Sequence, residues 1–445
     1  MNPAIANPAI ANLARLSRLA RLARAAVLDN PTHNRSPRTS RNSRGWPGLY
    51  LGYGTNGPVY GGAEHHALIL GPPRSGKTTR LAIPNLARHP GPAVVTSTKA
   101  DIINATIKTR ANKGRCYIWD PNRQTPLPAG AEPLRWSPVV GCQQWDQAVA
   151  TAHALAGAAR PDRHNGETHW IERAQAVLAP LLHAAALNNT GLPAVTAWLH
   201  RRELLEPLTA LQQAEATLAA DVLQGVTKTD PRELSGILST ADSLLAAYNT
   251  NTALDTTRNP NLDPATFPTS TDTIYLCPTG TNHQLHAPLI IALLDQIRTH
   301  TYHHKPRPPL LWTLDELAHI APLPDLTATI AEGGSQGLTI LACLQDLSQA
   351  RHRWHQQADG FLTLFTHKII LPGIADTTTL RQISDLAGDT DIPVPTTSRD
   401  NRLISPTTTS WRPDRRPRLP INTIANGQPH QALLITRTTP HRVHI

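Results

Sequence analysis

The chain has 445 residues, a formal net charge of +10 at pH 7 and 40% hydrophobic residues. That length allows two or three domains of about 150 residues, and the composition excludes a wholly disordered chain. No stretch approaches the roughly 18–20 consecutive apolar residues of a transmembrane helix, so we expect none. The charge favours a polyanion, either nucleic acid or acidic lipid, as partner. Because the 42 basic residues include only 7 lysines, a bias in genome composition is the competing explanation.

Residues 1–45 differ from the rest of the chain. In "NLARLSRLARLARAA" (12–26), leucine and arginine each recur at every third position. A helix here would have an apolar face and a basic face, which suits an anionic membrane surface or an acidic partner. A disordered basic leader is the alternative. The composition of residues 30–45 is typical of a linker.

Strands and helices alternate from residue 49 onward. We expect strands at 67–70, 92–98 and 115–120, with helices at 77–86 and 101–111 between them. The alternation resumes later with strands at 272–278, 309–316, 338–345 and 366–373 and a helix at 284–300. A Thr/Pro/Arg-rich stretch (392–420) then precedes a last strand at 431–437. Short apolar strands separated by helices predict an α/β fold, with a mainly parallel sheet covered on both faces.

Residues 143–250 interrupt this pattern with helical periodicity and almost no strand signal. The interruption predicts an all-α domain inserted into the α/β domain. The predicted organisation is a leader and linker (1–45), the first part of a nucleotide-binding domain (46–140), the inserted domain (141–265), the second part of the nucleotide-binding domain (266–395), and a Pro/Arg-rich segment with the C-terminal strand (396–445).

The segment from Gly71 to Thr78, "GPPRSGKT", matches the phosphate-binding P-loop pattern GxxxxGK[ST]. An expected strand enters the segment and an expected helix leaves it, as phosphate binding at a helix N-terminus requires. Lys77 would bind the β- and γ-phosphates of ATP, and Thr78 would ligate Mg²⁺. The predicted nucleotide-binding residues are Gly71, Pro72, Pro73, Arg74, Ser75, Gly76, Lys77, Thr78 and Thr79.

Two later strands end in polar residues suited to hydrolysis. Asp315 ends "PLLWTLD" and is expected to complete the magnesium site, because ligands of parallel sheets bind where the strands end. Glu316 follows it and would polarise the attacking water. Gln345 ends "LTILACLQ" and could sit between that water and the γ-phosphate, with helix capping or solvent exposure as alternatives. The predicted catalytic residues are Lys77, Glu316 and Gln345.

Other site types are disfavoured by the sequence. A GTPase would carry NKxD, whereas "NKGR" (112–115) lacks the aspartate, and "DLAG" (385–388) is too far from the P-loop to be a switch. The four cysteines lack CxxC spacing and lie in or beside apolar stretches, which predicts buried reduced thiols rather than a zinc site. A basic segment carries Arg399, Arg402, Arg412, Arg415, Arg416 and Arg418 with Trp411 among them. It could bind single-stranded nucleic acid or form a solvated basic loop.

Several stretches together resemble the type IV secretion coupling proteins, the TraG/TraD-like conjugation ATPases related to FtsK and HerA translocases. They are "GPPRSGKTTRLAIPNLARHPGPAVVTSTKADI" (71–102), "HWIERAQAVLAPLLHA" (169–184), "DTIYLCP" (272–278) and "LLWTLDELAHI" followed by "EGGSQGLTILACLQDLSQARHRW". The resemblance covers roughly residues 49–440. It implies a RecA-like hexameric ring ATPase that delivers single-stranded, relaxase-bound DNA or protein to a secretion channel. It also implies ATP and Mg²⁺ as cofactors and a location at the cytoplasmic face of the membrane, or else in the cytoplasm.

The chain departs from the family pattern in three places. Family members usually begin with transmembrane helices, so anchoring here would use the basic leader, a partner or a missing upstream segment. An arginine that often precedes the glutamine strand, a candidate trans-acting finger, is replaced by Gly334, with Arg351 and Arg353 as conceivable substitutes. An aspartate before the lysine turn is replaced by Ser97, leaving Lys99.

Two other functions compete with this one. A double-stranded DNA pump of the FtsK kind would need a C-terminal DNA-reading module, and the chain ends soon after its last expected strand. A non-hydrolysing adaptor would bind nucleotide only to assemble and would recruit relaxase through its helices. The pair Asp315–Glu316 argues against the adaptor, whereas Gly334 leaves it open.

Overall fold

In the computed structural model, residues 45–158, 165–278, 283–398 and 408–445 are described. Residues 1–44 of the leader and linker, and Arg399 and Arg402 of the basic segment, therefore lie outside the described residues. Across the described ranges, no helix has both the length and the apolarity needed to cross a membrane.

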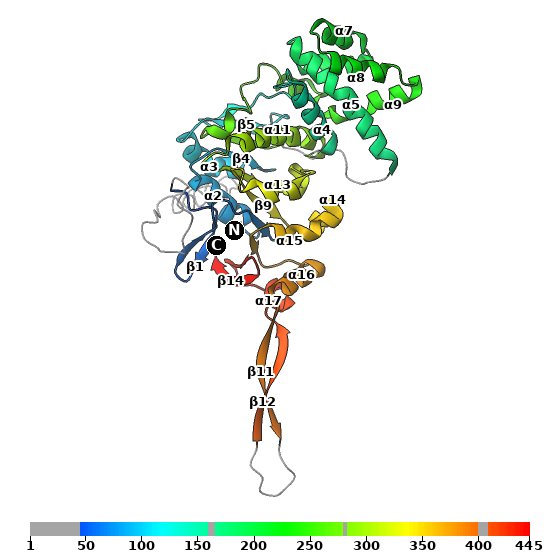
Figure 1. Cartoon of the computed structure of the whole chain (residues 1–445). Coiled ribbons are helices and arrows are strands. Elements are labelled where there is room, and N and C mark those ends of the chain that lie inside the picture. The colour runs from blue at the N-terminus through cyan, green and yellow to red at the C-terminus, as the bar shows by residue number, and fades with distance from the viewer. Residues whose placement is uncertain (1–44, 159–164, 279–282, 399–407) are drawn as a thin grey trace, which may run out of the picture.

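The core of the molecule is one large twisted sheet whose order is β2-β1-β14-β13-β10-β3-β9-β8-β4-β7-β5-β6 (Figure 1). The parallel strands are β10 (His367–Ile370), β3 (Ala67–Leu70), β9 (Leu338–Leu344), β8 (Leu310–Leu314), β4 (Ala93–Thr96), β7 (Thr273–Leu276), β5 (Cys116–Trp119) and β6 (Glu132–Pro133). Most were expected, and they confirm the mainly parallel sheet. β3 lies between β10 and β9, so the P-loop emerges near the middle of the sheet.

Antiparallel strands extend the sheet beyond β10. They are β13 (Gln431–Thr436), β14 (Thr439–His444), β1 (Tyr50–Gly54) and β2 (Gly57–Tyr60). Only β13 was predicted as a strand. The others have short or interrupted apolar patterns. They pair as two hairpins, β1 with β2 and β13 with β14, and β14 also pairs with β1.

Helices cover both faces of the sheet, as predicted. The residues of each strand alternate between two cores: Leu68 and Leu70 belong to one, Ala67 and Ile69 to the other. The smaller core is completed by the π-helix η1 (Lys77–Ala82), α2 (Ile83–Arg88) and α3 (Asp101–Ala111). The larger core is completed by α11 (His283–His304), α12 (Leu317–Ile320), α13 (Leu326–Gly333), α14 (Leu347–Trp354), η4 (His355–Gly360), α15 (Phe361–Leu364), α16 (Thr377–Ala387) and α17 (Ile421–Ala425).

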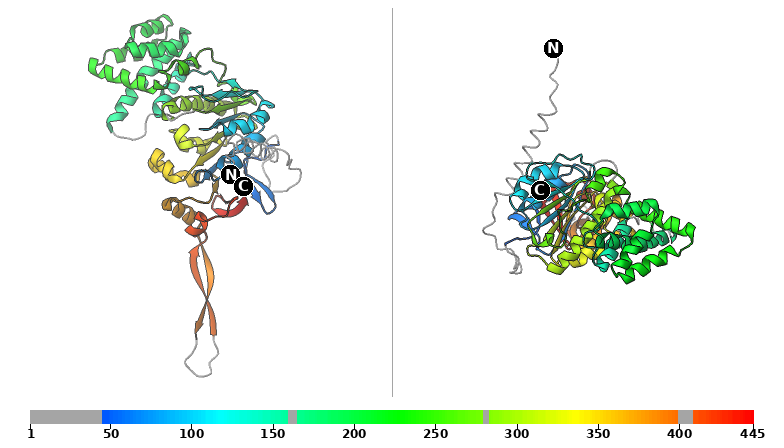
Figure 2. Two further views of the ribbon diagram at one scale, coloured as in Figure 1. Left: turned by 180° about the vertical axis from the view of Figure 1, so that it is seen from behind. Right: turned by 90° about the horizontal axis from the view of Figure 1, so that it is seen from above.

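Between β6 and β7 the described residues form helices and no strand. The helices are α4 (Trp145–Ala158), α5 (Asn165–Leu187), α6 (Leu192–Arg201), α7 (Leu205–Gln213), α8 (Thr217–Thr227), α9 (Pro231–Leu244), η2 (Ala246–Tyr248), α10 (Asn251–Asp255) and η3 (Phe267–Thr269). Helix α4 packs against both α5 and α11, which joins this group to the helices over the sheet. Figure 2 shows α5–α9 gathered to one side of the sheet when the molecule is viewed from above.

The Thr/Pro/Arg-rich stretch forms a ribbon rather than a loop. Strands β11 (Asp389–Ser398) and β12 (Thr408–Pro417) pair antiparallel and project from the body of the molecule, at the opposite end from α5–α9 (Figures 1 and 2). Prolines weaken a strand prediction, but in a two-stranded ribbon each strand is an edge that tolerates them. Arg415 pairs with Asp389 at 3.0 Å, and Arg416 pairs with Asp414 at 2.8 Å. Both arginines are largely exposed, as a solvated segment requires. Only the expectation of a loop is wrong, because the described residues of this segment form paired strands.

All four cysteines are free and buried, which confirms the prediction of reduced thiols. Cys343 lies on β9 beside the site described next.

Candidate active site

The segment between β3 and η1 folds as a compact loop held by backbone hydrogen bonds, one to β9 and one within the loop. The Gly71 N–H donates to the Leu344 carbonyl of β9 at 3.2 Å, and the Ser75 N–H donates to the Pro72 carbonyl at 3.3 Å. A Cβ at Gly71 would lie 2.7 Å from Leu371 Cβ and 2.8 Å from Ser75 Oγ, so only glycine fits there. Gly76 has φ +102°, which glycine adopts without steric cost. Both glycines of the motif are therefore needed for the shape of the loop.

The loop carries two polar side chains, Lys77 and Ser75, that a phosphate could bind. The Lys77 ammonium is buried and donates to the carbonyls of Gly71 at 2.5 Å and Pro72 at 3.1 Å. The Ser75 hydroxyl is buried without a hydrogen-bond partner among the described residues. Phosphate oxygens are stronger partners for an ammonium than neutral carbonyls are. These residues fit a bound phosphate.

Thr78 and Asp315 meet across 237 positions of sequence. The Thr78 hydroxyl donates to Asp315 Oδ2 at 2.8 Å. The Asp315 carbonyl accepts from Thr96 Oγ1 at 2.9 Å, which fixes the end of β8 against β4. Burial raises the pKa of the Asp315 carboxyl, and the Thr78 hydrogen bond opposes that shift. A hydroxyl and a carboxylate at this spacing are the oxygen ligands that Mg²⁺ prefers, so the pair fits the metal predicted from sequence.

Glu316 occupies the turn between β8 and α12. Its φ of +57° is unusual for a residue with a side chain, and its carbonyl accepts from the Ile320 N–H at 3.0 Å. Strained backbone of this kind is common where function fixes a side chain. Glu316 is partly exposed, unlike the buried Asp315 before it.

Gln345 follows β9, whose last residue contacts the loop through the Leu344–Gly71 hydrogen bond. Its own N–H donates to Gln349 Oε1 at 2.9 Å, and Gln349 Nε2 lies 3.3 Å from His319 Nε2 on α12. The structure therefore brings the ends of β3, β8 and β9 together.

Two features of the site were missed by sequence reasoning. The Cys343 thiol contacts Asp315, and its pKa is raised well above the ordinary value, first by burial and then by that carboxylate. Arg80 covers Gly76 and donates to the Ile445 carbonyl at 2.7 Å. The period of two along β9 places Cys343 and Gln345 on one face, which was an available signal. No comparable signal existed for Arg80.

The helix after the loop also differs from expectation. It begins as the π-helix η1, in which the Ile83 N–H reaches back to the Thr78 carbonyl. Pro84 has no N–H to give the Arg80 carbonyl its usual partner, so the regular α-helical ladder is broken there. Of the remaining loop residues, Pro73 and Arg74 are exposed and Thr79 is half-buried.

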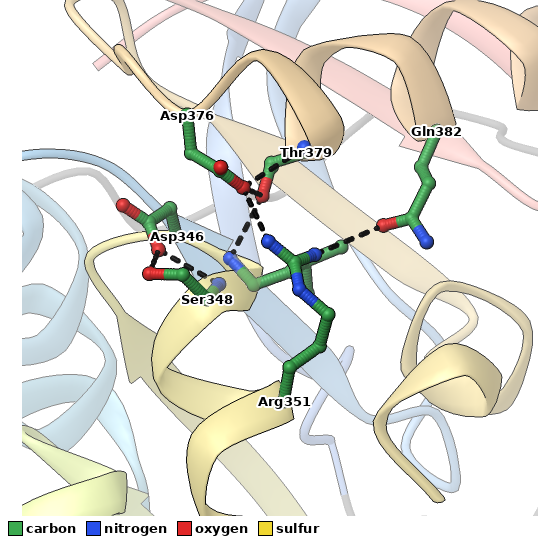
Figure 3. Close-up of polar contacts among 7 residues, drawn as sticks. Asp346, Ser348, Arg351, Asp376, Thr379 and Gln382 are labelled. Atoms are coloured by element: carbon green, nitrogen blue, oxygen red, sulfur yellow. Dashed lines mark hydrogen bonds and ion pairs between the residues drawn. The ribbon is translucent and has the colours of Figure 1, made fainter. Parts of the chain in front are cut away.

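The three positions considered for a trans-acting arginine, Gly334, Arg351 and Arg353, have other roles in this chain. A Cβ at Gly334 would lie 2.1 Å from the Glu64 carbonyl oxygen, so no side chain fits. Arg351 donates to Asp376 Oδ2 at 2.6 Å and to Gln382 Oε1 at 3.5 Å, which ties α14 to α16 (Figure 3). Arg353 donates to the Pro322 carbonyl at 3.4 Å. Ser97, at the aspartate position, accepts from the Lys99 N–H at 3.2 Å and shapes the turn.

This sheet and loop define a RecA-like P-loop NTPase fold. The sequence matches the family described as "Type IV secretory system Conjugative DNA transfer" over residues 15–443. The chain therefore belongs to that family, as the resemblance indicated.

Solved structures of conjugative coupling proteins share the fold. The bacterial coupling protein TrwBdeltaN70 in its unbound monoclinic form has a TM-score of 0.69 at 16% identity, covering 96% of this chain and 90% of that chain. TrwB in complex with a non-hydrolysable ATP analogue has a TM-score of 0.66 at 16% identity, with 95% and 91% covered. TrwB with ADP and Mg²⁺ has a TM-score of 0.65 at 16% identity, with 95% and 90% covered. At these identities the likeness concerns the fold. No curated protein sequence matches the chain.

Proposed function

We propose that this chain is an ATPase that moves DNA, single-stranded and relaxase-bound, or protein substrates to a type IV secretion channel. The observation that carries the proposal is the 2.8 Å hydrogen bond between Thr78 and Asp315. It joins the phosphate-binding loop, which follows β3, to a carboxylate at the end of β8, and β9 lies between those two strands. P-loop enzymes use such a pairing of a loop hydroxyl and a strand-end carboxylate for magnesium. Family membership and the ATP analogue and ADP–Mg²⁺ complexes of TrwB support the same reading.

The roles proposed for the residues follow from their positions. Lys77 would leave the loop carbonyls to bind the β- and γ-phosphates, while Thr78 and Asp315 would hold Mg²⁺. The metal supplies charge neutralisation for the phosphates when bound. The Glu316 carboxylate would accept a proton from the attacking water, and Gln345 would orient that water. Arg74, Ser75, Gly76 and Thr79 would offer backbone N–H groups to the phosphates. Gly71, Pro72 and Pro73 would line the loop, and the two prolines have no N–H to donate.

The wider assembly is part of the proposal. A homohexameric ring would act at the cytoplasmic face of the membrane, held by channel proteins or by surface contact through residues 1–45. Helices in 141–265 would take part in substrate recognition. The net charge of +10 suits DNA as a partner.

The test is ATP turnover by the purified chain with and without single-stranded DNA, at a concentration that permits hexamers. We expect turnover stimulated by DNA and a fall of about 100-fold in Glu316→Gln, because general-base catalysis contributes ~10²–10⁴. Glu215→Gln is the matched control, since Glu215 is an exposed glutamate with φ +55° on another loop.

Absence of ATP turnover under all conditions would contradict the proposed ATPase and favour an adaptor that binds nucleotide without hydrolysing it. Stimulation by double-stranded DNA alone would favour an FtsK-like pump.

A further inference from the structure

A cavity of about 610 Å³ lies at the C-terminal ends of α12 and α14, the two short helices that begin beside the candidate active site. It is lined by the end of α4, the loop between α12 and α13, and the junction of α14 with η4. Its volume falls within the ~300–1,000 Å³ typical of ligand sites. None of the roles proposed above uses this cavity.

After β8 and after β9, the strands that precede Glu316 and Gln345, the chain continues into the wall of the cavity. Glu316 begins α12, and the chain then reaches the wall at Pro322 and Pro324. Gln345 precedes α14, and that helix reaches the wall at Arg353 and Trp354. A change in position at either Glu316 or Gln345 is thus linked to the cavity by a single helical element.

Helix α14 is fixed strongly enough to act as one piece. The Asp346 carboxylate caps its N-terminus by accepting from the Ser348 N–H at 2.8 Å, and the Leu347 N–H donates to Thr379 Oγ1 at 3.1 Å. One turn later, Arg351 forms an ion pair with Asp376 at the start of α16, as Figure 3 shows. At the far end, the Trp354 indole donates to the Leu323 carbonyl at 2.7 Å, which joins α14 to the loop after α12.

The cavity also connects the sheet to the helical group. A Cβ at Gly157 of α4 would lie 2.9 Å from Pro324 Cγ, so α4 contacts the loop after α12 closely. His153 on the same helix lines the cavity and lies 3.3 Å from Gln175 of α5. A ligand here would touch both the ATPase core and α4.

The lining is rich in hydrogen-bond donors. Arg353, two histidines (His153 and His355) and two amides (Gln356 and Gln357) line the cavity, and Asp325 is the one carboxylate among the described lining residues. Burial lowers the pKa of the Arg353 guanidinium, so an anion beside it would stabilise its charge. The Trp354 ring is 5% exposed and already bonded, which leaves little surface for stacking a base. The chemistry therefore suits phosphate oxygens rather than bases.

We propose that this cavity binds the phosphodiester backbone of single-stranded DNA and couples that binding to ATP hydrolysis through α12 and α14. The proposal rests on the proposed function and deepens it by placing the DNA contact. Recognition would be independent of sequence and sensitive to salt.

The experiment measures binding of a fluorescent oligothymidylate, over a range of salt, to the full chain. In the variant Gln356→Glu/Gln357→Glu we expect affinity to fall about tenfold or more, with a parallel loss of DNA-stimulated ATP turnover. Arg353→Gln should reduce the slope of log K against log[salt] by about 0.7, the value for one phosphate contact on a single strand. Gln224→Glu on α8, also exposed, is the control and should match the wild type.

Wild-type affinity and salt slope in the double variant would overturn the proposal while leaving a DNA-stimulated ATPase intact. A double variant that self-associates differently but binds DNA normally would also overturn it, in favour of an interface between copies. If the wild-type chain hydrolyses ATP but binds no oligothymidylate, both this proposal and the DNA part of the proposed function fail. Absence of turnover despite DNA binding that depends on the cavity would contradict the proposed ATPase and the coupling step, but not the DNA site.

Discussion

Ionisable groups are buried in different ways at the two ends of the parallel strands. The end at which the strands finish is the first edge of the sheet, and the end at which they start is the second edge. Where the strands end, Lys77 contacts loop carbonyls and Asp315 contacts a threonine hydroxyl, partners that a nucleotide and a metal could replace. Where the strands begin, the Ile340 N–H donates to His66 Nδ1 at 2.9 Å, and Lys368 Nζ donates to the Arg437 carbonyl at 2.6 Å. The second set is held by the backbone of neighbouring strands. Buried ionisable groups therefore indicate a binding function when a ligand could replace their partners, and a structural role when their partners belong to the fold.

The largest effect should come from Asp315→Asn at the first edge. We expect ATP turnover to fall at least ~100-fold, because the metal ligand is lost. We expect the melting temperature to stay level or rise, since burial disfavours the carboxylate that the change removes. Enzyme assay and thermal unfolding together test this, with the exposed Asp359→Asn as control. A marked loss of stability in Asp315→Asn would mean that Asp315 has a structural role, as the buried groups at the second edge do.

The second edge should govern stability at acidic pH. Burial lowers the pKa of both His66 and His367 to about 4, with the charges of His65 and, for His367, Lys368 contributing. Between pH 6.5 and 4 the unfolded chain binds protons that the folded chain does not, so stability is lost as pH falls. The loss is at most ~3 kcal/mol per histidine, from ~1.36 kcal/mol per pKa unit.

Denaturant unfolding across that pH range provides the check. The double variant His66→Gln/His367→Gln should show a shallower dependence on pH than the wild type, whereas His304→Gln, at an exposed position, should not. An unchanged slope in the double variant would mean that these histidines are not the groups that titrate.

A smaller effect is expected where the beginning of β3 meets the end of α13. Gly334→Ala should lower the free energy of unfolding by about 1–3 kcal/mol, because its Cβ would meet the Glu64 carbonyl oxygen at 2.1 Å and the backbone must shift. Gly333→Ala is the matched control, since its nearest neighbour is a leucine side chain at 3.4 Å. Equal stability of the two variants would show that the loop at Glu64 yields easily.

Local pattern was enough to predict the parallel half of the fold and the strand ends at which the candidate site residues lie. The P-loop, Asp315 and Gln345 each stand at the end of a short apolar strand, and strand ends of a parallel sheet meet at one edge. The ribbon β11–β12 was not predicted, because four prolines on its strands, such as Pro393 and Pro413, argue against strands unless both are edges. The π-helix η1 depends on how Pro84 disturbs a helix that already follows a tight loop.

Long-range contacts account for the rest. The clash at Gly334 arises from Glu64, some 270 positions away along the chain, and the Thr78–Asp315 bond spans 237 positions. The cavity at Arg353 is formed by three segments that lie between residues 153 and 357. No local pattern carries such information.

The most direct test of the account is the thermal stability of the chain against increasing Mg²⁺–ATP, in wild type and Lys77→Ala. Ligand that binds only the folded state stabilises it by ~2.7 kcal/mol at 100 times Kd. We expect a melting temperature that rises with ligand in the wild type and does not change with ligand in Lys77→Ala. Equal shifts in both proteins, or none in the wild type, would contradict the assignment of this edge of the sheet as the nucleotide site.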